Sequence, residues 1–442
     1  MTKQKMTSNE RNNLIKYVVP AALANTCFFL FSVVDGIFVG RGVGTQALGA
    51  VNLALPFVLI AEALNSLVTI GGVTIVAIRL GRGDKEGAES AFMHSFLVIL
   101  LVGALITIGG TCFTRPAVRL LGARESYAAL VEEYLFWWAI FGIPSSLNVN
   151  LMGFCRNDGS SGRVAVGTGV ATVLNIILDW LFVFPLKMGL MGAAVATGIS
   201  QTVSLCIILS HFLMKQGSLC FQRVPVSLKL FRKIAFRGLP EAIAQISPPV
   251  TTLCTNYVLL AGYGDIGINA YSVISYVSSF TQAIFFGASE GLQPLFGQSY
   301  GAKEERDLKF YLRAGIYISA VGSLICFAGY LFLGSHLCRL FGADPKTTGF
   351  AVEQMWKCCW GLVIASINTL LSAYFYSTKR SREAIILNVV RGLIANTAII
   401  LILPRILGRG IIWHTLGIYE LIVLAFAFGL LKNSERNGIQ YK

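Results

Sequence analysis

The sequence predicts an all-α membrane protein of twelve transmembrane helices, arranged as two pseudo-symmetric six-helix bundles around a central cleft. Three observations lead to this fold class. The chain of 442 residues is 55% hydrophobic and only 13% charged, a composition unlike that of soluble domains. Apolar runs of about twenty residues, enough to cross the hydrocarbon core of a bilayer, recur along the whole chain. The chain also resembles itself when it is shifted by half its length.

Apolar runs, separated by short polar and charged breaks, divide the chain into the predicted helices. The first run follows a short basic stretch and is typical of a signal anchor rather than of a cleaved secretory signal. The predicted ranges are 14–38, 46–78, 90–112, 128–152, 164–184, 190–212, 239–260, 268–297, 310–334, 350–376, 384–403 and 411–431.

The net charge of +14 is distributed unevenly between the predicted loops. Lys and Arg are concentrated in alternate loops, on the side that also holds both termini and the long basic segment 215–237. This bias follows the positive-inside rule and predicts that both termini are cytoplasmic. The charge therefore orients the chain in a lipid bilayer, and nucleic acid is not expected as a partner. A cleft within one chain requires no second copy, so we expect a monomer.

An internal repeat with an offset of about 220 residues relates the two halves. The segment RLLGA at residues 119–123 returns as RLFGA at 339–343, and Asn175 returns as Asn396. An even number of helices in each half gives both halves the same orientation in the membrane, as in transporters that work by alternating access. The predicted parts are an N-terminal lobe of residues 1–214, a cytoplasmic linker loop of 215–238 and a C-terminal lobe of 239–442.

Ionisable residues inside the predicted helices are the candidate functional residues. Each costs about 2.5–3.5 kcal/mol on membrane-insertion scales, so each needs a reason to be there. The candidates are Asp35, Glu62, Asp179, Glu290, Glu420 and the pair Glu353 and Lys357.

Asp179 ends a polar stripe on the fifth predicted helix. Thr168, Thr172 and Asn175 precede it at spacings that place all four on one face, and a similar stripe on the first helix ends at Asp35. A set of oxygen ligands suits a hard cation such as Na+, whereas two neighbouring carboxylates in a low dielectric can exchange protons. The alternative is a polar contact that only joins helices.

Three further residues are candidates for substrate binding. Glu290 and Gln293 lie on one side of the eighth predicted helix, and Glu62 marks a polar stripe on the second. A structural carboxyl that binds a neighbouring group explains these residues equally well. Glu241 is expected at the start of the seventh helix, where the helix dipole favours an anion, and we assign it no functional role.

Several segments together resemble sequence motifs of the multidrug and toxic compound extrusion (MATE) family. The resemblance covers nearly the whole chain and implies two six-helix bundles that export drugs, driven by inward flow of Na+ or H+. The segments are VDGIFVG (34–40), LGRGD (80–84), LNIILD (174–179), GAAVAT (192–197) and GLQP (291–294).

The resemblance also implies a cation-coupling site in the N-terminal lobe. Asp35, Asn175 and Asp179 match the acidic and amide residues of that site in the family, and Thr197 matches a threonine that often joins them. These residues are the expected ligands of Na+, if Na+ is the coupling ion. Some members use acidic residues of the C-terminal lobe instead, a pattern that this sequence does not match.

The alternatives belong to other classes of membrane protein. A flippase for lipid-linked oligosaccharides or peptidoglycan precursors, of the same superfamily, needs cations in its cavity to bind pyrophosphate. The mid-helix cation weighed for that role is Lys357, which Glu353 already matches. We find no metal cluster, nucleophile elbow or phosphate loop of an enzyme, and no channel filter. The sequence thus predicts a non-enzymatic antiporter without a cofactor, which exports hydrophobic organic cations in exchange for Na+ or H+ across the cell membrane.

Overall fold

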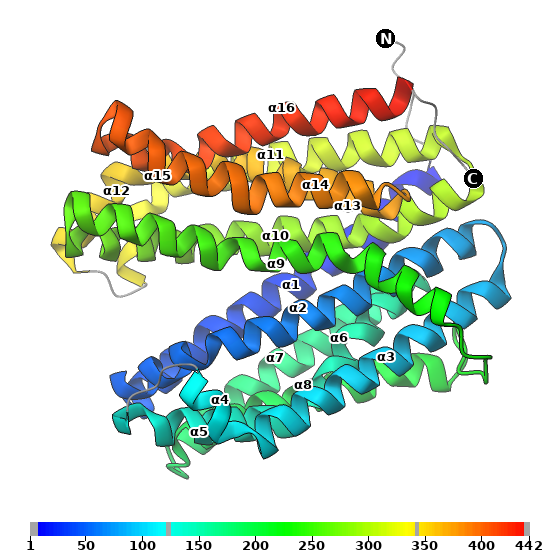
Figure 1. The fold of residues 1–442 in the computed structure, drawn as a ribbon, viewed down its shortest axis with the longest axis horizontal. Coiled ribbons are helices and arrows are strands. Elements are labelled where there is room, and N and C mark those ends of the chain that lie inside the picture. The colour runs from blue at the N-terminus through cyan, green and yellow to red at the C-terminus, as the bar shows by residue number, and fades with distance from the viewer. Residues whose placement is uncertain (1–7, 121–124, 341–343, 437–442) are drawn as a thin grey trace. The chain divides into compact units, whose positions relative to one another are not determined.

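The computed structural model describes residues 8–120, 125–340 and 344–436, and this part of the chain is helical apart from short connections and the segment before Leu228. No strand occurs in these ranges. The first half contains α1 Ser8–Gly42, α2 Thr45–Gly81, α3 Lys85–Cys112, α4 Thr114–Leu120, α5 Glu125–Ile140, α6 Gly142–Asn157, α7 Ser161–Val183 and α8 Gly189–Leu213. The second half contains α9 Leu228–Tyr263, α10 Asp265–Ala302, α11 Glu305–Leu340, α12 Pro345–Cys359, α13 Gly361–Ser377, α14 Ser381–Val389, the π-helix η1 Val390–Ala395, α15 Asn396–Leu407, the 3-10 helix η2 Arg409–His414 and α16 Thr415–Arg436 (Figure 1).

Each predicted helical segment corresponds to one helix or to consecutive helices that are joined directly, so the all-α membrane fold is confirmed. Among the described residues, eight helices are long and apolar enough to cross a membrane, or nine if the bent pair α12 and α13 forms one span. Helices α9 and α10 have the length, with 36 and 38 residues, but they carry more polar side chains. The reason is that both line a polar cavity, described below.

The chain forms two compact units whose boundary lies between Gly238 and Leu239. We call the residues up to Gly238 unit 1 and those from Leu239 onward unit 2. Residues 228–238, which the sequence analysis placed in the linker loop, instead form the first three turns of α9. These turns are helical because Leu230 and Ile234 are buried in the core of unit 1.

Two glycines allow α2 and the start of α9 to approach closely. A Cβ on Gly238 would lie 1.7 Å from the carbonyl oxygen of Leu67, and one on Gly71 would lie 2.0 Å from that of Ile234. Any larger residue at either position would force the helices apart. The basic start of α9, residues 228–238, is therefore packed tightly against α2 within unit 1.

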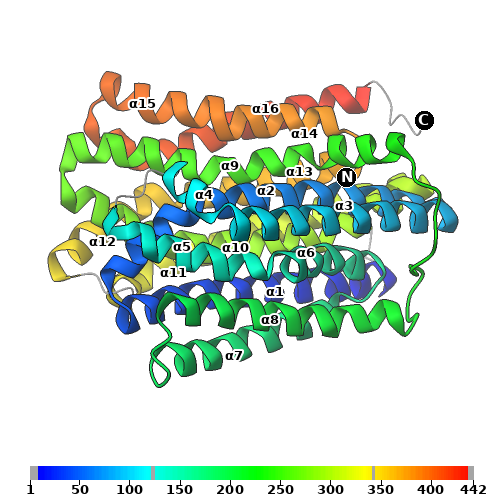
Figure 2. The ribbon, with the colours of Figure 1, turned by 60° about the horizontal axis from the view of Figure 1, so that its bottom comes forward.

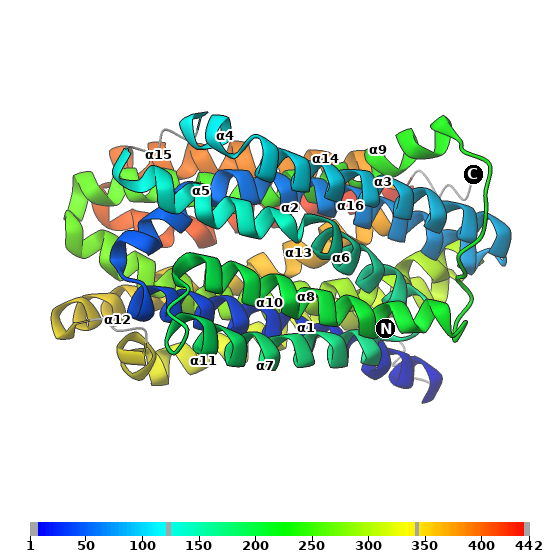
Figure 3. The ribbon, with the colours of Figure 1, turned by 90° about the horizontal axis from the view of Figure 1, so that it is seen from below.

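In unit 1, α1 packs against α7, and α7 packs against α8, which also contacts α5. Figure 2 and Figure 3 both show α1 running beside α7 and α8. A second group of α2, α3 and α6 surrounds a buried aromatic core that includes Phe92, Phe154 and Phe212. In unit 2, α10 packs against α11 and α13, and α13 packs against α16.

Candidate functional sites

The first candidate site lies in unit 1, where α1 and α7 pack together. The buried face of α7 includes Thr168, Asn175 and Asp179, so the predicted polar stripe faces the interior. Asp35 is half-buried on α1, and its carboxylate interacts electrostatically with that of Asp179. The two acids are 144 residues apart in the sequence but lie on helices that pack against each other.

The polar atoms of this site are unsatisfied within the described part of the chain. Both carboxylate oxygens of Asp179, both polar atoms of the Asn175 amide and one carboxylate oxygen of Asp35 are buried without a hydrogen bond of normal geometry. The hydroxyl oxygen of Thr168 is buried in the same state. Buried polar groups in folded proteins are nearly always paired, so this cluster of unpaired polar atoms indicates a missing partner. A bound cation or a proton would supply one, and the donor set of carboxylate, amide and hydroxyl oxygens fits Na+.

Two further residues lie on α5 and α8, neighbouring helices of unit 1. Tyr134 of α5 interacts electrostatically with Asp35, and the sequence analysis did not single it out because a tyrosine near an outer helix end is unremarkable. Thr197 is half-buried on α8, the helix that packs against α7. The described structure records no hydrogen bond from Thr197 to the acids or to Asn175, so its membership of the site stays a prediction.

Glu62 lies apart from these acids in sequence and is half-buried on α2. Its neighbours on the helix, Asn65 and Thr69, are buried. Asn150 of α6 donates a hydrogen bond to the hydroxyl of Thr69 (3.3 Å). The stripe that contains Glu62 therefore faces partly into the helix packing of unit 1, and a role in substrate binding stays a prediction.

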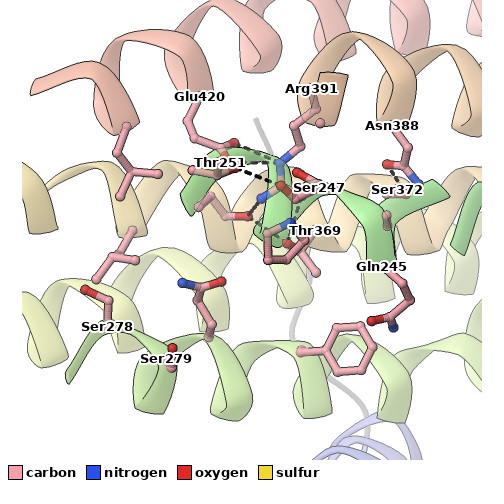
Figure 4. A pocket seen from close by; sticks show the side chains of 18 of the residues that line it. Gln245, Ser247, Thr251, Ser278, Ser279, Thr369, Ser372, Asn388, Arg391 and Glu420 are labelled. Carbon is pink, nitrogen blue, oxygen red and sulfur yellow. Dashed lines mark hydrogen bonds and ion pairs between the residues drawn. The ribbon is translucent and has the colours of Figure 1, made fainter. Parts of the chain in front are cut away.

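The second candidate site is a cavity of about 320 Å³ whose lining comes entirely from unit 2. Helices α9, α10, α12, α13, α14, η1 and α16 all contribute to its wall, and Figure 4 shows side chains from several of them turned toward one another. Most of the polar wall consists of hydroxyl and amide groups, and the charged residues that line it are Glu241, Arg391 and Glu420.

Arg391 and Glu420 form an ion pair in the wall of this cavity (Figure 4). The Arg391 Nε donates to both carboxylate oxygens of Glu420, at 2.9 and 3.1 Å. The other guanidinium nitrogens donate to the hydroxyl of Thr369 (3.0 Å) and to the carbonyl of Ala365 (3.1 Å). Glu420 also accepts from the amide of Asn368 (2.7 Å). The pair is therefore neutral as a unit and well hydrogen-bonded, the condition under which a buried ion pair is tolerated.

This pair corrects the sequence analysis, which weighed Lys357 as the mid-helix cation. Arg391 lies within the predicted helix 384–403, so the insertion-cost argument applied to the acids would have found it as well. Lys357 does pair with Glu353, at 3.9 Å, but the Glu353 side chain is 68% exposed. The ion pair in the interior of unit 2 is therefore Arg391–Glu420 rather than Lys357–Glu353.

Glu241 also differs from its expected place. Helix α9 begins at Leu228, so Glu241 is far inside the helix rather than at its start. It is buried and lines the cavity, where the amide of Gln245 donates to it at 3.4 Å. The expectation that a helix N-terminus accounts for this acid is wrong.

Of the predicted substrate residues in unit 2, one lines the cavity and one approaches it. Gln293 is buried in α10 and donates to the hydroxyl of Tyr376 (2.7 Å), and both residues line the cavity. Glu290 is half-buried on the same helix and interacts electrostatically with Glu241. The structure thus places Glu290, Glu241 and Gln293 in one region of unit 2, while their contact with substrate stays a prediction.

A helical, multi-pass membrane protein with acids buried at membrane depth and a polar cavity in one unit belongs to the class of membrane transporters. A family model described as MatE matches residues 20–181 and 240–402, which together exceed half of the chain. The two matches begin at residues 20 and 240, the offset found in the sequence repeat. The chain therefore belongs to the MatE family, as the sequence motifs indicated.

Individual relatives agree with this assignment. The multidrug export protein MepA of Staphylococcus saprophyticus is 26% identical over 411 residues, which cover 91% of this chain and 89% of that protein. MepA of Staphylococcus aureus (strain NCTC 8325) is 26% identical over 425 residues, 93% of this chain and 91% of that protein. A solved outward-facing multidrug resistance MATE family transporter of the MOP superfamily has a TM-score of 0.92 at 22% identity, covering 99% of this chain and 100% of its own. At 22% identity, the similarity to this solved structure shows the fold alone.

Proposed function

We propose that the chain is a secondary active antiporter of the cell membrane, which exports hydrophobic organic cations such as drugs and toxic compounds. Export is exchanged for inward flow of Na+ or H+ by alternating access. The relatives named multidrug export protein support the substrate class, because the match runs over about nine tenths of both chains. We further propose that the protein works as a monomer.

The observation that carries the proposal is the pair of acids Asp35 and Asp179 with their unsatisfied oxygens. No cation is recorded as a partner of either acid in the described part of unit 1, so their charge needs a mobile counterion. A bound Na+ or a shared proton cancels one of the two negative charges and lets the helices pack; its departure leaves two like charges in a low dielectric. Ion binding then favours one arrangement of α1 and α7 and ion release favours another, which is the differential affinity that coupling requires.

For substrate binding we propose Glu290, Gln293 and Glu62. A carboxylate at membrane depth supplies the countercharge for an organic cation, and aromatic faces add cation–π attraction. Glu290 and Gln293 are on α10, close to the cavity of unit 2, while Glu62 is on α2 of unit 1.

A flippase for pyrophosphate-linked lipids is the second candidate, and Arg391 gives it a cation that the sequence analysis had missed. That cation is already held by Glu420, Thr369 and Ala365. The other charged side chain of the cavity, Glu241, is an acid. A doubly charged pyrophosphate would therefore meet a wall without net positive charge, and the cation exporter is favoured.

Transport in proteoliposomes tests the proposed function. Purified protein is reconstituted, tetraphenylphosphonium is loaded as the cationic substrate, and a pH gradient or a Na+ gradient is imposed separately. We expect one of the two gradients to drive tetraphenylphosphonium transport well above the passive permeation measured in protein-free liposomes. Absence of transport under both gradients, with the protein folded and inserted, would contradict the antiporter.

The proposed topology has both termini in the cytoplasm, following the distribution of Lys and Arg. A cysteine introduced at Lys229, at the start of α9, is expected to react with a membrane-impermeant thiol reagent only when the cytoplasmic side is exposed. Because the chain has 10 native cysteines, the labelling is done in a variant in which they are replaced by serine or alanine. Labelling of Lys229→Cys from outside intact cells would reverse the topology.

A further inference from the structure

The wall of the unit 2 cavity has a composition that a site for hydrophobic cations does not require. Gln245, Thr251, Ser278, Ser279 and Ser372 all line it with uncharged hydrogen-bonding groups (Figure 4). Polar groups inside a membrane protein are tolerated where they face water or a polar ligand. The volume of about 320 Å³ falls at the lower end of the range of small-molecule sites, which starts at about 300 Å³.

The charges in this cavity leave one acid with capacity for a partner. Arg391 forms its ion pair with Glu420, so the two add little net charge, and Arg391 attracts Glu241 without an ion pair between them in the described residues. Glu241 is buried, and the one hydrogen bond recorded for it in the described residues is the long contact with Gln245 (3.4 Å). Glu290 adds a second negative charge nearby. A cationic group of a ligand would therefore be most stable beside Glu241.

The backbone around the cavity carries a second, independent sign of function. Arg391 and Gly392, which both line the cavity, lie in the π-helix η1 Val390–Ala395, which interrupts the α-helix formed by α14 and α15. π-Helical turns are rare and occur frequently at functional sites, because they redirect side chains that a regular helix would point elsewhere. Here the irregular turn presents the guanidinium of Arg391 to Glu420 across the cavity wall.

We propose that this cavity binds a polar primary amine, that is, a protonated amine on a scaffold rich in hydroxyl or amide groups, as in an amino sugar. The ammonium group lies against Glu241, and the hydroxyl groups of the ligand bond to the side chains of α9, α10 and α13. The proposal goes beyond the export of hydrophobic cations, since it concerns a ligand class that partitions poorly into lipid. It is a statement about binding and does not depend on the coupling ion.

Matched probes in detergent solution test this site on the full-length protein. Glucosamine carries the amine, N-acetylglucosamine is its neutral counterpart, and binding is followed by equilibrium dialysis and by the midpoint of thermal unfolding. We expect glucosamine to bind saturably and to raise the unfolding midpoint, and N-acetylglucosamine to do neither. Glu241→Gln keeps the shape and hydrogen bonding but removes the charge, and we expect about tenfold weaker glucosamine binding or more. Glu353→Gln, at an exposed acid of the same unit, is the control and should bind like the wild type.

A second variant and two salt controls complete the binding test. Gln245→Met removes the amide beside Glu241 and retains the acid, so it is expected to weaken glucosamine binding even if Glu241→Gln does not fold. Equal binding of the two sugars, or unchanged glucosamine binding in both variants, overturns the proposal. If NaCl or ammonium chloride reproduces the full effect of glucosamine, the cavity is a bare cation site and the proposal is also overturned. Tetraphenylphosphonium export without glucosamine binding would refute this inference alone, whereas glucosamine binding without export would refute the proposed function alone.

Discussion

Asn175 in unit 1 and Asn396 in unit 2 are equivalent residues of the internal repeat, yet their surroundings differ. Both are completely buried. The amide of Asn396 donates to the hydroxyl of Thr251 and to the carbonyl of Gly392 (3.4 Å), whereas the amide of Asn175 interacts with Asp179 without a hydrogen bond of normal geometry in the described structure. The same side chain thus joins helices in one unit and remains unsatisfied beside two acids in the other.

The acids of the two units differ in the same way. Glu420 is matched by Arg391 and by Asn368, while Asp35 and Asp179 face each other without a recorded cation. A matched pair fixes the helices that carry it, because either partner alone would be a buried charge. An unmatched pair suits the mobile counterion of the proposed coupling site. Under the proposed function, the repeat therefore carries a fixed polar network in unit 2 and an exchangeable one in unit 1.

Removing one charge from the acid pair of unit 1 is expected to have the largest effect. Asp35→Asn and Asp179→Asn are each expected to abolish gradient-driven export of tetraphenylphosphonium in proteoliposomes, because an amide can neither release a proton nor offer a full charge to Na+. Thermal stability in detergent should be unchanged or slightly higher, since a buried charge that costs about 2.5–3.5 kcal/mol to insert is removed.

The control for these variants is Asp265→Asn, the same substitution at an exposed residue of α10, which should transport like the wild type. Full export in Asp35→Asn and Asp179→Asn would show that coupling lies elsewhere. Lost export together with an unfolded protein would instead support the reading of these acids as polar contacts between helices.

The sequence was sufficient for the fold class and for placing the candidate acids of unit 1 on their helices, because both depend on local pattern. Apolar length identifies the helices, and helical spacing places Asn175 and Asp179 on one face. The insertion cost marks Arg391 and Glu420 singly, but their pairing could not be found from local pattern, since they lie on different helices. The start of α9 was also misplaced: its first turns are basic and amphipathic, and they are helical because Leu230 and Ile234 pack on unit 1.

The next prediction removes one partner of the fixed pair in unit 2. Arg391→Met leaves Glu420 buried without its cation, and we expect a loss of stability of about 3–5 kcal/mol. Glu420→Gln should cost a similar amount, because the guanidinium is then unpaired. Replacing both residues in the double variant Arg391→Met, Glu420→Gln should recover part of the loss. The measurement is unfolding of the detergent-solubilised protein, and a single variant as stable as the wild type would disprove the fixed network.

A further prediction concerns substrate recognition by Glu290, which lies in unit 2 outside the matched pair. Glu290→Gln is expected to weaken export of cationic compounds several-fold more than export of neutral ones, since its carboxylate supplies countercharge in a low dielectric. Export rates for tetraphenylphosphonium and for a neutral dye are compared, with Glu353→Gln as the exposed control. Equal losses for both kinds of compound would assign Glu290 a structural or coupling role.

The smallest expected effect tests the equivalent asparagines directly. Asn396→Ala removes the hydrogen bonds to Thr251 and Gly392, and the net cost of such a loss is about 1 kcal/mol. Asn175→Ala removes no hydrogen bond of normal geometry, so the unfolding midpoint in detergent should not fall, although we expect transport to weaken because an oxygen ligand of the proposed coupling site is lost. The two substitutions are identical and both positions are fully buried, so the difference between them measures satisfaction of the amide rather than lost volume. Equal destabilisation by both variants would mean that Asn175 is as firmly bonded as Asn396, and the distinction between an exchangeable and a fixed network would fail at its central residue.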